Sequence, residues 1–510
     1  MAYETIPTSE TAGELFLCPP GMKLAEIVEE ALKLGKEYPE TLEAIEKDLH
    51  DQAKRKKLER LKDRAWQASR TMLLEGMEDE VAQELRVGDV NLGVGRPRLP
   101  TEVVLVFLQV RGYLGSVTNQ KAAERIADSM TLRGYVTSKG LRFPAVRTIL
   151  DNLNGVSNAT RELILDKQLL SIRQEGLDDF SMALIDSTSV EGNSEWPTDS
   201  ELLYKLVGRA FRSGLQLKAF GVPPFRSWSL PRWLRELDRL GFEINATAGK
   251  SGGKRKRRTC YRRLYRIVEK ALARLRQEQH RARQSVESID LPPSIRARLQ
   301  RVWTGIEEDL TASERVLDYS CRRVVHEQKI PSAEKVLSVS DPSVAMIVKG
   351  GRETVLGYKP QIVRSEHGFA TALIIEEGNI SDSASLLPAI RQHKERTGVT
   401  PHSLSADDGY ASKAGRDALL KMKVKNVSFS GSKGRRVMPE EDWDDDVFAA
   451  LRGKRSAVES IIFILKYAFE FDHMRRRGID AVRAEMLEKI LAHNFWRMSF
   501  IRRQRRRRAG

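Results

Sequence analysis

The sequence contains few cysteines and no long hydrophobic run. Its three cysteines, Cys18, Cys260 and Cys321, are too few and too widely spaced for a disulfide framework or a paired zinc site. Such low cysteine usage is expected in a reducing intracellular environment. No segment approaches the roughly 18 uncharged residues that a membrane span requires, and the N-terminal MAYETIPTSE lacks a basic region followed by an apolar run. We therefore expect a cytoplasmic protein with no membrane partner.

Several motifs of common enzyme classes are also missing. HExxH does not occur, and the eight histidines form no pair with the spacing of zinc ligands. Residues 249–253, GKSGG, resemble both the end of a phosphate-binding loop and the serine hydrolase motif GxSxG. The loop requires a glycine five positions earlier, where Ile244 stands, and no apolar strand leads into the segment. These observations argue against ATP binding and serine hydrolysis at this segment.

Positive charge is abundant and concentrated in short runs. The chain has 86 Lys and Arg against 70 Asp and Glu, a formal net charge of +16. One run lies inside the chain and another, RRQRRRR, near its C-terminus. This pattern indicates a polyanionic partner, although a solvated basic face gives the same composition. The internal run comprises Lys254, Arg255, Lys256, Arg257 and Arg258.

The first third of the chain shows helical patterns. Residues 22–90 are highly charged and predict a helical arm or assembly region. Glycines and prolines in VGDVNLGVGRPRLPTE mark a boundary, where Arg96 and Arg98 either enter a DNA minor groove or belong to a linker. Three short helices over residues 100–175 would suit a helix-turn-helix module, and an ordinary helical bundle would give the same pattern.

Strand patterns begin at DDFSMALIDSTSV, which predicts a buried strand ending at Asp186. They disappear through a basic helical segment and return at VLGYKPQIV and FATALIIEE. A helix is predicted over SDSASLLPAIRQHKE, followed by a strand that runs into Asp407, a further helix, and a short strand in VKNVSFSG. The rest of the chain is predicted to be helical to its end.

Three carboxylates stand at informative positions in this order. Asp186 and Asp407 end predicted strands, and strand ends in open α/β sheets commonly form ligand sites. Glu459 lies on a predicted helix that can pack across the sheet. Carboxylate oxygens suit Mg²⁺, and a pair of ions needs such groups to converge. The alternative for each aspartate is that it only closes a turn, and Asp408 competes with Asp407 for the second position.

These residues carry a resemblance to a known family. The segments LIDSTSVEGNSEWPTDSELL, GYKPQIV, EEGNISDSASLLPAI, SADDGYAS and RSAVESIIFILK resemble the landmarks of DDE-type transposases of bacterial insertion sequences, in the order that the family shows. The resemblance spans about residues 180–500. Arg455, Glu459 and Lys466 match a spacing found in one branch of the family, where a tyrosine often precedes the arginine. Arg452 replaces that tyrosine here.

The predicted helix around Glu459 places Arg452, Arg455, Glu459 and Lys466 on one face at three- and four-residue steps. A salt-bridged surface helix would show the same spacing. Beside two strand-end aspartates, we interpret Glu459 as a metal ligand, with the three cations binding DNA phosphates or an unpaired end base. Glu191 and Asp199 either assist as auxiliary ligands or serve local structure.

The resemblance implies a multidomain protein with an α/β RNase H-like catalytic core, a mixed sheet flanked by helices. An all-α DNA-binding region precedes the core, and a long basic helical insertion follows the first strand. The predicted segments are an arm at 1–92, a DNA-binding domain at 93–176, a core at 177–210 and 336–500, an insertion at 211–335, and a basic tail at 501–510.

The implied function is DNA transposition in the bacterial nucleoid. The enzyme would bind terminal inverted repeats, cleave the element ends and join their 3′ hydroxyls to target DNA, as a homodimer or larger assembly. Asp186 would bridge two Mg²⁺ ions, for which Mn²⁺ can substitute, while Asp407 and Glu459 would each hold one. The alternatives are a nuclease that cuts without joining and an inactive DNA-binding protein derived from a transposase.

Overall fold

The computed structural model describes residues 23–68, 99–195, 197–226, 229–247, 250–287, 289–331, 334–348 and 354–509. The chain divides into two compact units. The first, which we call the sheet unit, takes its residues from Met1–Gln52, Arg96–Ser194 and Ser343–Gly510. The second, the bundle unit, takes its residues from Ala53–Gly95 and Glu195–Pro342. Arg96 and Arg98 lie outside the described residues.

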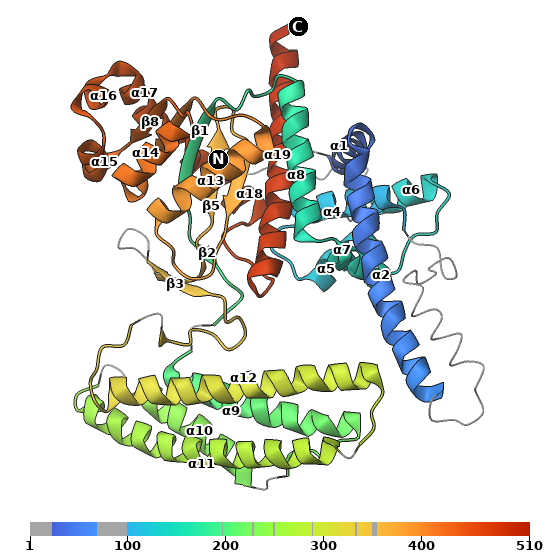
Figure 1. The fold of residues 1–510 in the computed structure, drawn as a ribbon, viewed down its shortest axis with the longest axis vertical. Helices are drawn as coiled ribbons and strands as arrows, with labels where there is room; N and C mark the ends of the chain where they lie inside the picture. The colour runs from blue at the N-terminus through green and yellow to red at the C-terminus, as the bar shows by residue number, and fades with distance from the viewer. Residues whose placement is uncertain are drawn as a thin grey trace. The chain divides into compact units, whose positions relative to one another are not determined.

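A five-stranded mixed sheet forms the centre of the sheet unit (Figure 1). The strand order is β6-β5-β1-β7-β8, in which β1 pairs antiparallel with β5 and parallel with β7. Strands β5 and β6 pair antiparallel, and β7 and β8 pair parallel. The strands are β1 (Met182–Ser187), β5 (Gln361–Ser365), β6 (Ala370–Ile374), β7 (Ser403–Ala406) and β8 (Asn426–Phe429).

Helices cover both faces of this sheet, because alternate residues of its strands are apolar on each side. Ala183 and Ile185 of β1 share a buried core with Leu386 and Ile390 of helix α13 (Asp382–Thr397). Helix α18 (Ala457–Phe469) contacts β1 and β5, and α19 (Ile479–Ala509) contacts β6. The prediction of a mixed sheet flanked by helices is therefore confirmed.

One predicted strand, VLGYKPQIV, is two strands in different sheets. It breaks at Lys359 and Pro360, between β4 (Thr354–Tyr358) and β5. Proline has no backbone N–H to donate to a ladder, so the pairing is interrupted there. Strand β4 belongs to a second, antiparallel sheet of order β2-β4-β3, with β2 (Val190–Glu191) and β3 (Ala345–Val348).

Five helices, rather than three short ones, occupy residues 101–174. Helix α4 is buried from Val103 to Tyr113, because it contacts α1 (Leu24–Glu37), α7 and α19. Tyr113 at its end donates a hydrogen bond to the carbonyl of Ala492 at 2.9 Å. Thr118 caps α5, accepting from the N–H of Lys121. The helices are α4 (Thr101–Tyr113), α5 (Asn119–Asp128), α6 (Met130–Ser138), α7 (Val146–Gly155) and α8 (Asn158–Gln174).

The bundle unit consists of four helices around one apolar core, and α2 (Pro39–Ala68) contributes residues to both units. The bundle begins earlier than the expected residue 211. Helix α9 packs against α10, α11 and α12 through Leu203, Leu206 and Val207, which are buried in their shared core. The four helices are α9 (Asp199–Gln216), α10 (Ser229–Ala246), α11 (Gly253–Glu287) and α12 (Pro293–Val324).

The basic tail is not the separate segment that we expected, since α19 continues through residue 509. Arg502 donates to Glu175 at 2.6 Å and pairs with Glu30, while Arg503 donates to Glu26 at 2.6 Å. Acidic side chains from α1 and from the end of α8 therefore order the start of this tail. Among the described residues, no helix is both long and apolar enough to cross a membrane.

Candidate active site

Asp186 and Asp407 lie at the carboxyl ends of neighbouring parallel strands. Ile185 of β1 pairs with Ala406 of β7, so the two aspartates are the next residues in this register. Asp186 is buried, with 6% of its surface exposed, and its Oδ1 accepts from the N–H of Ser187 at 2.7 Å. Asp407 caps a short 3₁₀ turn, η3 (Asp408–Tyr410), by accepting from the N–H of Gly409 at 2.9 Å.

The competing Asp408 serves a different purpose. Its Oδ1 accepts hydrogen bonds from the backbone N–H groups of Lys433 at 2.6 Å and Gly434 at 3.0 Å. These groups lie in the first turn of α15 (Gly431–Val437), where backbone donors lack partners within the helix. This capping role favours Asp407 as the functional member of the pair.

Glu459 lies in the first turn of α18, on the helix that contacts β1. Its side chain is 60% exposed and accepts a hydrogen bond from Arg455 Nη2 at 2.7 Å. Helix α17 (Asp446–Lys454) ends just before Arg455, and α18 begins at Ala457. The continuous helical face predicted from 452 to 466 is therefore interrupted, although the Arg455–Glu459 pair survives as a contact across four residues.

The other two cations predicted beside Glu459 contact protein groups. Arg452 donates to the carbonyl of Trp443 at 2.6 Å, and its guanidinium lies 4.3 Å from the centre of that indole ring. Lys466 donates to the carbonyl of Ser189, just beyond β1, at 3.0 Å. Lys466 thus links the C-terminal half of α18 to the chain that leaves the end of β1.

The donor chemistry at the strand ends suits a hard divalent cation, since two carboxylates stand at adjacent positions. Within the part of the chain that the structure describes, however, no three His, Cys, Asp or Glu side chains are gathered closely enough to hold one metal ion. The carboxylate of Glu459 is engaged with Arg455 instead. Asp186 and Asp407 therefore form the ordered part of the candidate site.

A network beside these aspartates was not predicted. Lys359 Nζ lies 2.9 Å from Asp382 Oδ1, which also accepts from Gln361 Nε2 at 3.0 Å. Gln361 Oε1 accepts in turn from the hydroxyl of Tyr410. Burial, and then the charges of Asp382, Asp186 and Asp407, raise the pKa of Tyr410 well above its usual value.

The Tyr410 hydroxyl thus lies within the electrostatic influence of all three aspartates. GYKPQIV and SDSAS contain the other residues of the network, but their spacing alone does not indicate that they meet.

The predicted auxiliary acids both contact side chains of neighbouring elements. Glu191 Oε2 lies 3.1 Å from Nδ1 of His473 within the sheet unit. Asp199 belongs to the bundle unit, where it lies 2.5 Å from Arg323. Both arrangements agree with the local structural role that was the alternative for these residues.

The basic run at residues 254–258 forms the start of α11. Lys254 and Arg258 pair with Glu327, and Arg257 donates to the hydroxyl of Thr247 at 3.2 Å. The side chains of Arg255 and Lys256 are exposed. Lys254, which is also exposed, and these two residues are therefore the cations of this run that solvent reaches most freely.

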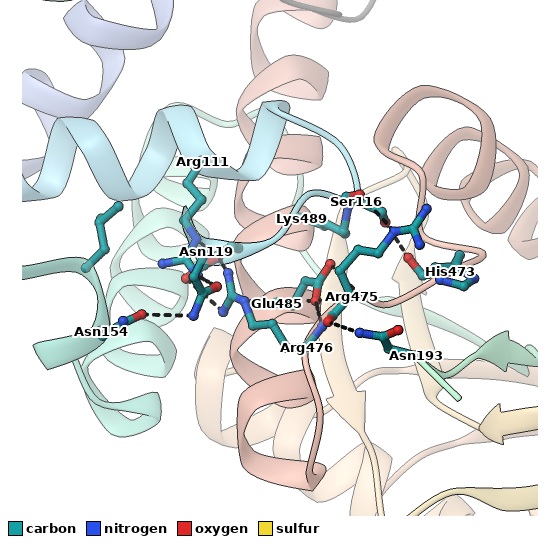
Figure 2. Close-up of polar contacts among 12 residues, drawn as sticks. Arg111, Ser116, Asn119, Asn154, Asn193, His473, Arg475, Arg476, Glu485 and Lys489 are labelled. Carbon is teal, nitrogen blue, oxygen red and sulfur yellow. Dashed lines mark hydrogen bonds and ion pairs between the residues drawn. The ribbon is translucent and has the colours of Figure 1, made fainter. Parts of the chain in front are cut away.

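A second group of charges is buried at a distance in sequence from the aspartates (Figure 2). Glu488 of α19 accepts from Arg161 at 2.8 Å, lies 3.3 Å from Arg111, and pairs with Arg476. The side chains of these four residues are at most 8% exposed. Figure 2 shows Arg111 and Arg476 approaching α19, with Asn119 hydrogen bonded to Arg111. This cluster joins α4 and α8 to α19.

The fold and the strand-end acids define an α/β protein with a candidate carboxylate site at the carboxyl ends of two inner strands of a mixed sheet. Residues 348–495 match the family model described as the transposase DDE domain. This match supports the resemblance to DDE-type transposases, since over these residues the chain is similar to the transposase DDE domain. Comparison with curated proteins and with solved structures gives no match. Asp407 and Glu459 lie within the matched residues, and Asp186 precedes them.

Proposed function

We propose that the chain is a DNA transposase that binds the terminal inverted repeats of its element, cleaves the ends and transfers the 3′ strands to target DNA. The observation that carries this proposal is the adjacent position of Asp186 and Asp407 at parallel strand ends, in a chain with a transposase DDE domain. The strand order β6-β5-β1-β7-β8 supports an RNase H-like core.

The residues that would hold the metal ions are Asp186, Asp407 and Glu459. These three carboxylates would together hold two Mg²⁺ ions, or Mn²⁺ in their place. When bound, such ions supply charge neutralisation and a nucleophile at neutral pH. Glu459 must first exchange its contact with Arg455, which lies 2.7 Å away. The released guanidinium would then be available to a DNA phosphate beside the site.

Two displacements at phosphorus would follow in one site. In the first, water forms a new P–O bond and the 3′ oxygen of the element end leaves as a hydroxyl. In the second, that hydroxyl forms a P–O bond to a target phosphate, and the 3′ oxygen of the broken target strand leaves. No covalent intermediate with the protein is required.

DNA would be held by cations on both units. Lys466 lies on α18, Arg455 lies just before it, and Arg452 lies in the last turn of α17. The basic run at 254–258 lies in the bundle unit. Cations of this kind neutralise phosphates without reading sequence. The helices between 93 and 176, together with Arg96 and Arg98, would recognise the terminal repeats. A homodimer or larger assembly in the nucleoid would join two ends.

The test is incubation of the full chain with Mg²⁺, a labelled fragment from the DNA that flanks the coding region, and a plasmid target. We expect joined product from the native chain and none from Asp186→Asn, Asp407→Asn or Glu459→Gln. The matched control is Asp417→Asn, which alters an exposed acid on α14 (Lys413–Lys421) and should leave joining intact. Cleavage without joining would indicate a nuclease, and binding without either reaction would indicate a DNA-binding protein.

A further inference from the structure

A chain of polar contacts connects Lys359 to the turn that carries Asp407. It runs from the ammonium of Lys359 to Asp382, from Asp382 to the amide of Gln361, and from Gln361 to the hydroxyl of Tyr410. Gln361 is 2% exposed and Tyr410 is fully buried. The Lys359 and Asp382 side chains are 14% and 20% exposed. The contacts are therefore largely shielded from water, which strengthens them.

The direction of each hydrogen bond in this series of side-chain contacts is determined. The Gln361 amide uses its N–H to donate to Asp382, so its oxygen is left as the acceptor for Tyr410. Tyr410 must therefore donate, as a protonated phenol does. An arrangement with one permitted direction orders the side chains more strongly than one in which donors and acceptors can exchange.

The chain of contacts ends at both candidate catalytic strands. Gln361 of β5 pairs with Ser187 of β1, the residue after Asp186. Tyr410 closes the turn that Asp407 caps. A Cβ at Gly409 would lie 2.9 Å from Asp382 Oδ2 and 3.2 Å from Asp407 Oδ1. Asp382 and Asp407 thus approach the same point from different elements, and a methyl group there would require at least the Asp382 carboxylate to shift.

We propose that Lys359 and Asp382 form a positioning pair for the carboxylate site, which sets both the geometry of the Asp407 turn and the charge beside it. The proposal rests on the proposed function, because it assigns Asp186 and Asp407 to divalent cations. Lys359 offsets the charge of Asp382, a carboxylate that lies beside the turn of Asp407. Neither Lys359 nor Asp382 is proposed to touch DNA or a metal ion.

The pair predicts an unequal response to its two charges. Asp382→Asn removes the carboxylate that neutralises the Lys359 ammonium, which keeps its contact with the carbonyl of Ile380. The charge of Lys359 is then uncompensated on the side of the Asp407 turn, where it repels a divalent cation. Lys359→Met removes that cation and should not weaken cation binding through charge. The double variant Lys359→Met/Asp382→Asn removes both charges and should restore most of what Asp382→Asn loses. A merely structural role for Asp382 predicts no such recovery.

The experiment measures Mn²⁺ binding to the full chain by titration calorimetry, without DNA. We expect Asp382→Asn to weaken Mn²⁺ binding about tenfold, the size expected for one added positive charge roughly 10 Å from a divalent ion in a partly screened site. The Mn²⁺ affinity of the double variant should return to within about threefold of that of the native chain. Lys359→Arg keeps the charge and should bind Mn²⁺ as the native chain does. Hydrogen exchange of peptides from β1, β7 and α13 establishes that each variant is folded.

Several results would overturn the proposal: unchanged Mn²⁺ binding in folded Asp382→Asn, a double variant as weak as Asp382→Asn, or no Mn²⁺ binding to the native chain. Joining assays on the same proteins separate this proposal from the proposed function. If the native chain joins DNA and Asp382→Asn binds Mn²⁺ normally, only the positioning pair fails. If the native chain binds Mn²⁺ with the expected pattern but neither cleaves nor joins DNA, only the proposed function fails.

Discussion

Replacing Glu488 by glutamine should destabilise the contact between α19 and the N-terminal helices. Burial alone would raise the pKa of Glu488, but Arg111, Arg476 and Arg161 lower it to about 2. The carboxylate is therefore ionised and surrounded by three guanidinium groups. Glutamine keeps the size of the side chain and removes its charge, which leaves these cations buried with less compensation. Removing one partner of a buried ion pair typically costs about 3–5 kcal/mol.

Hydrogen exchange can measure this loss locally in a chain with two units. We expect amides in α4, α8 and α19 to exchange with an opening free energy lower by about 3–5 kcal/mol in Glu488→Gln. The matched control is Glu102→Gln, which breaks an exposed pair with Lys139 and should cost under about 1 kcal/mol. A change in Glu488→Gln no larger than in the control would refute the reasoning.

Three further predictions concern the turn, the core and the tail. Gly409→Ala should slow end cleavage in a folded protein, because the new methyl group would shift the carboxylate of Asp382 or Asp407; normal cleavage would contradict this. Burial lowers the pKa of His393 to about 4. As pH falls from about 6.5 to 4, this histidine is protonated in the unfolded chain but not in the folded one, so the free energy of unfolding decreases. His393→Gln should flatten that decline in acid denaturation curves. Arg502→Gln should lower stability by about 1 kcal/mol in urea unfolding, since it removes contacts to two acids.

Local patterns predicted much of the sheet. The apolar run before Asp186, the helix over SDSASLLPAIRQHKE and the strand before Asp407 all form as expected. Each has a strong periodic or β-branched signal within a few residues. Asp186 and Asp407 lie at the ends of such strands. They are adjacent in the structure because β1 and β7 pair in parallel.

Features that depend on tertiary contacts were harder to predict. Helix α9 was assigned to the core, but its apolar face packs on helices that come from far along the chain. The basic tail was predicted as a separate segment from its composition alone. In the structure, Arg502 and Arg503 of α19 pair with acids at the end of α8 and on α1. Asp382 looked like an ordinary helix start, and its pairing with Lys359 arises only because β5 and α13 are neighbours.

Crystals of the protein with a DNA end and Mn²⁺, examined by anomalous scattering, would show directly which carboxylates bind the metal ions. We expect manganese peaks within about 2.3 Å of carboxylate oxygens of Asp186 and Asp407. Glu459 should have left Arg455 to bind one of the ions. Manganese bound elsewhere, or Glu459 still paired with Arg455 beside an ordered DNA end and bound metal, would contradict the account.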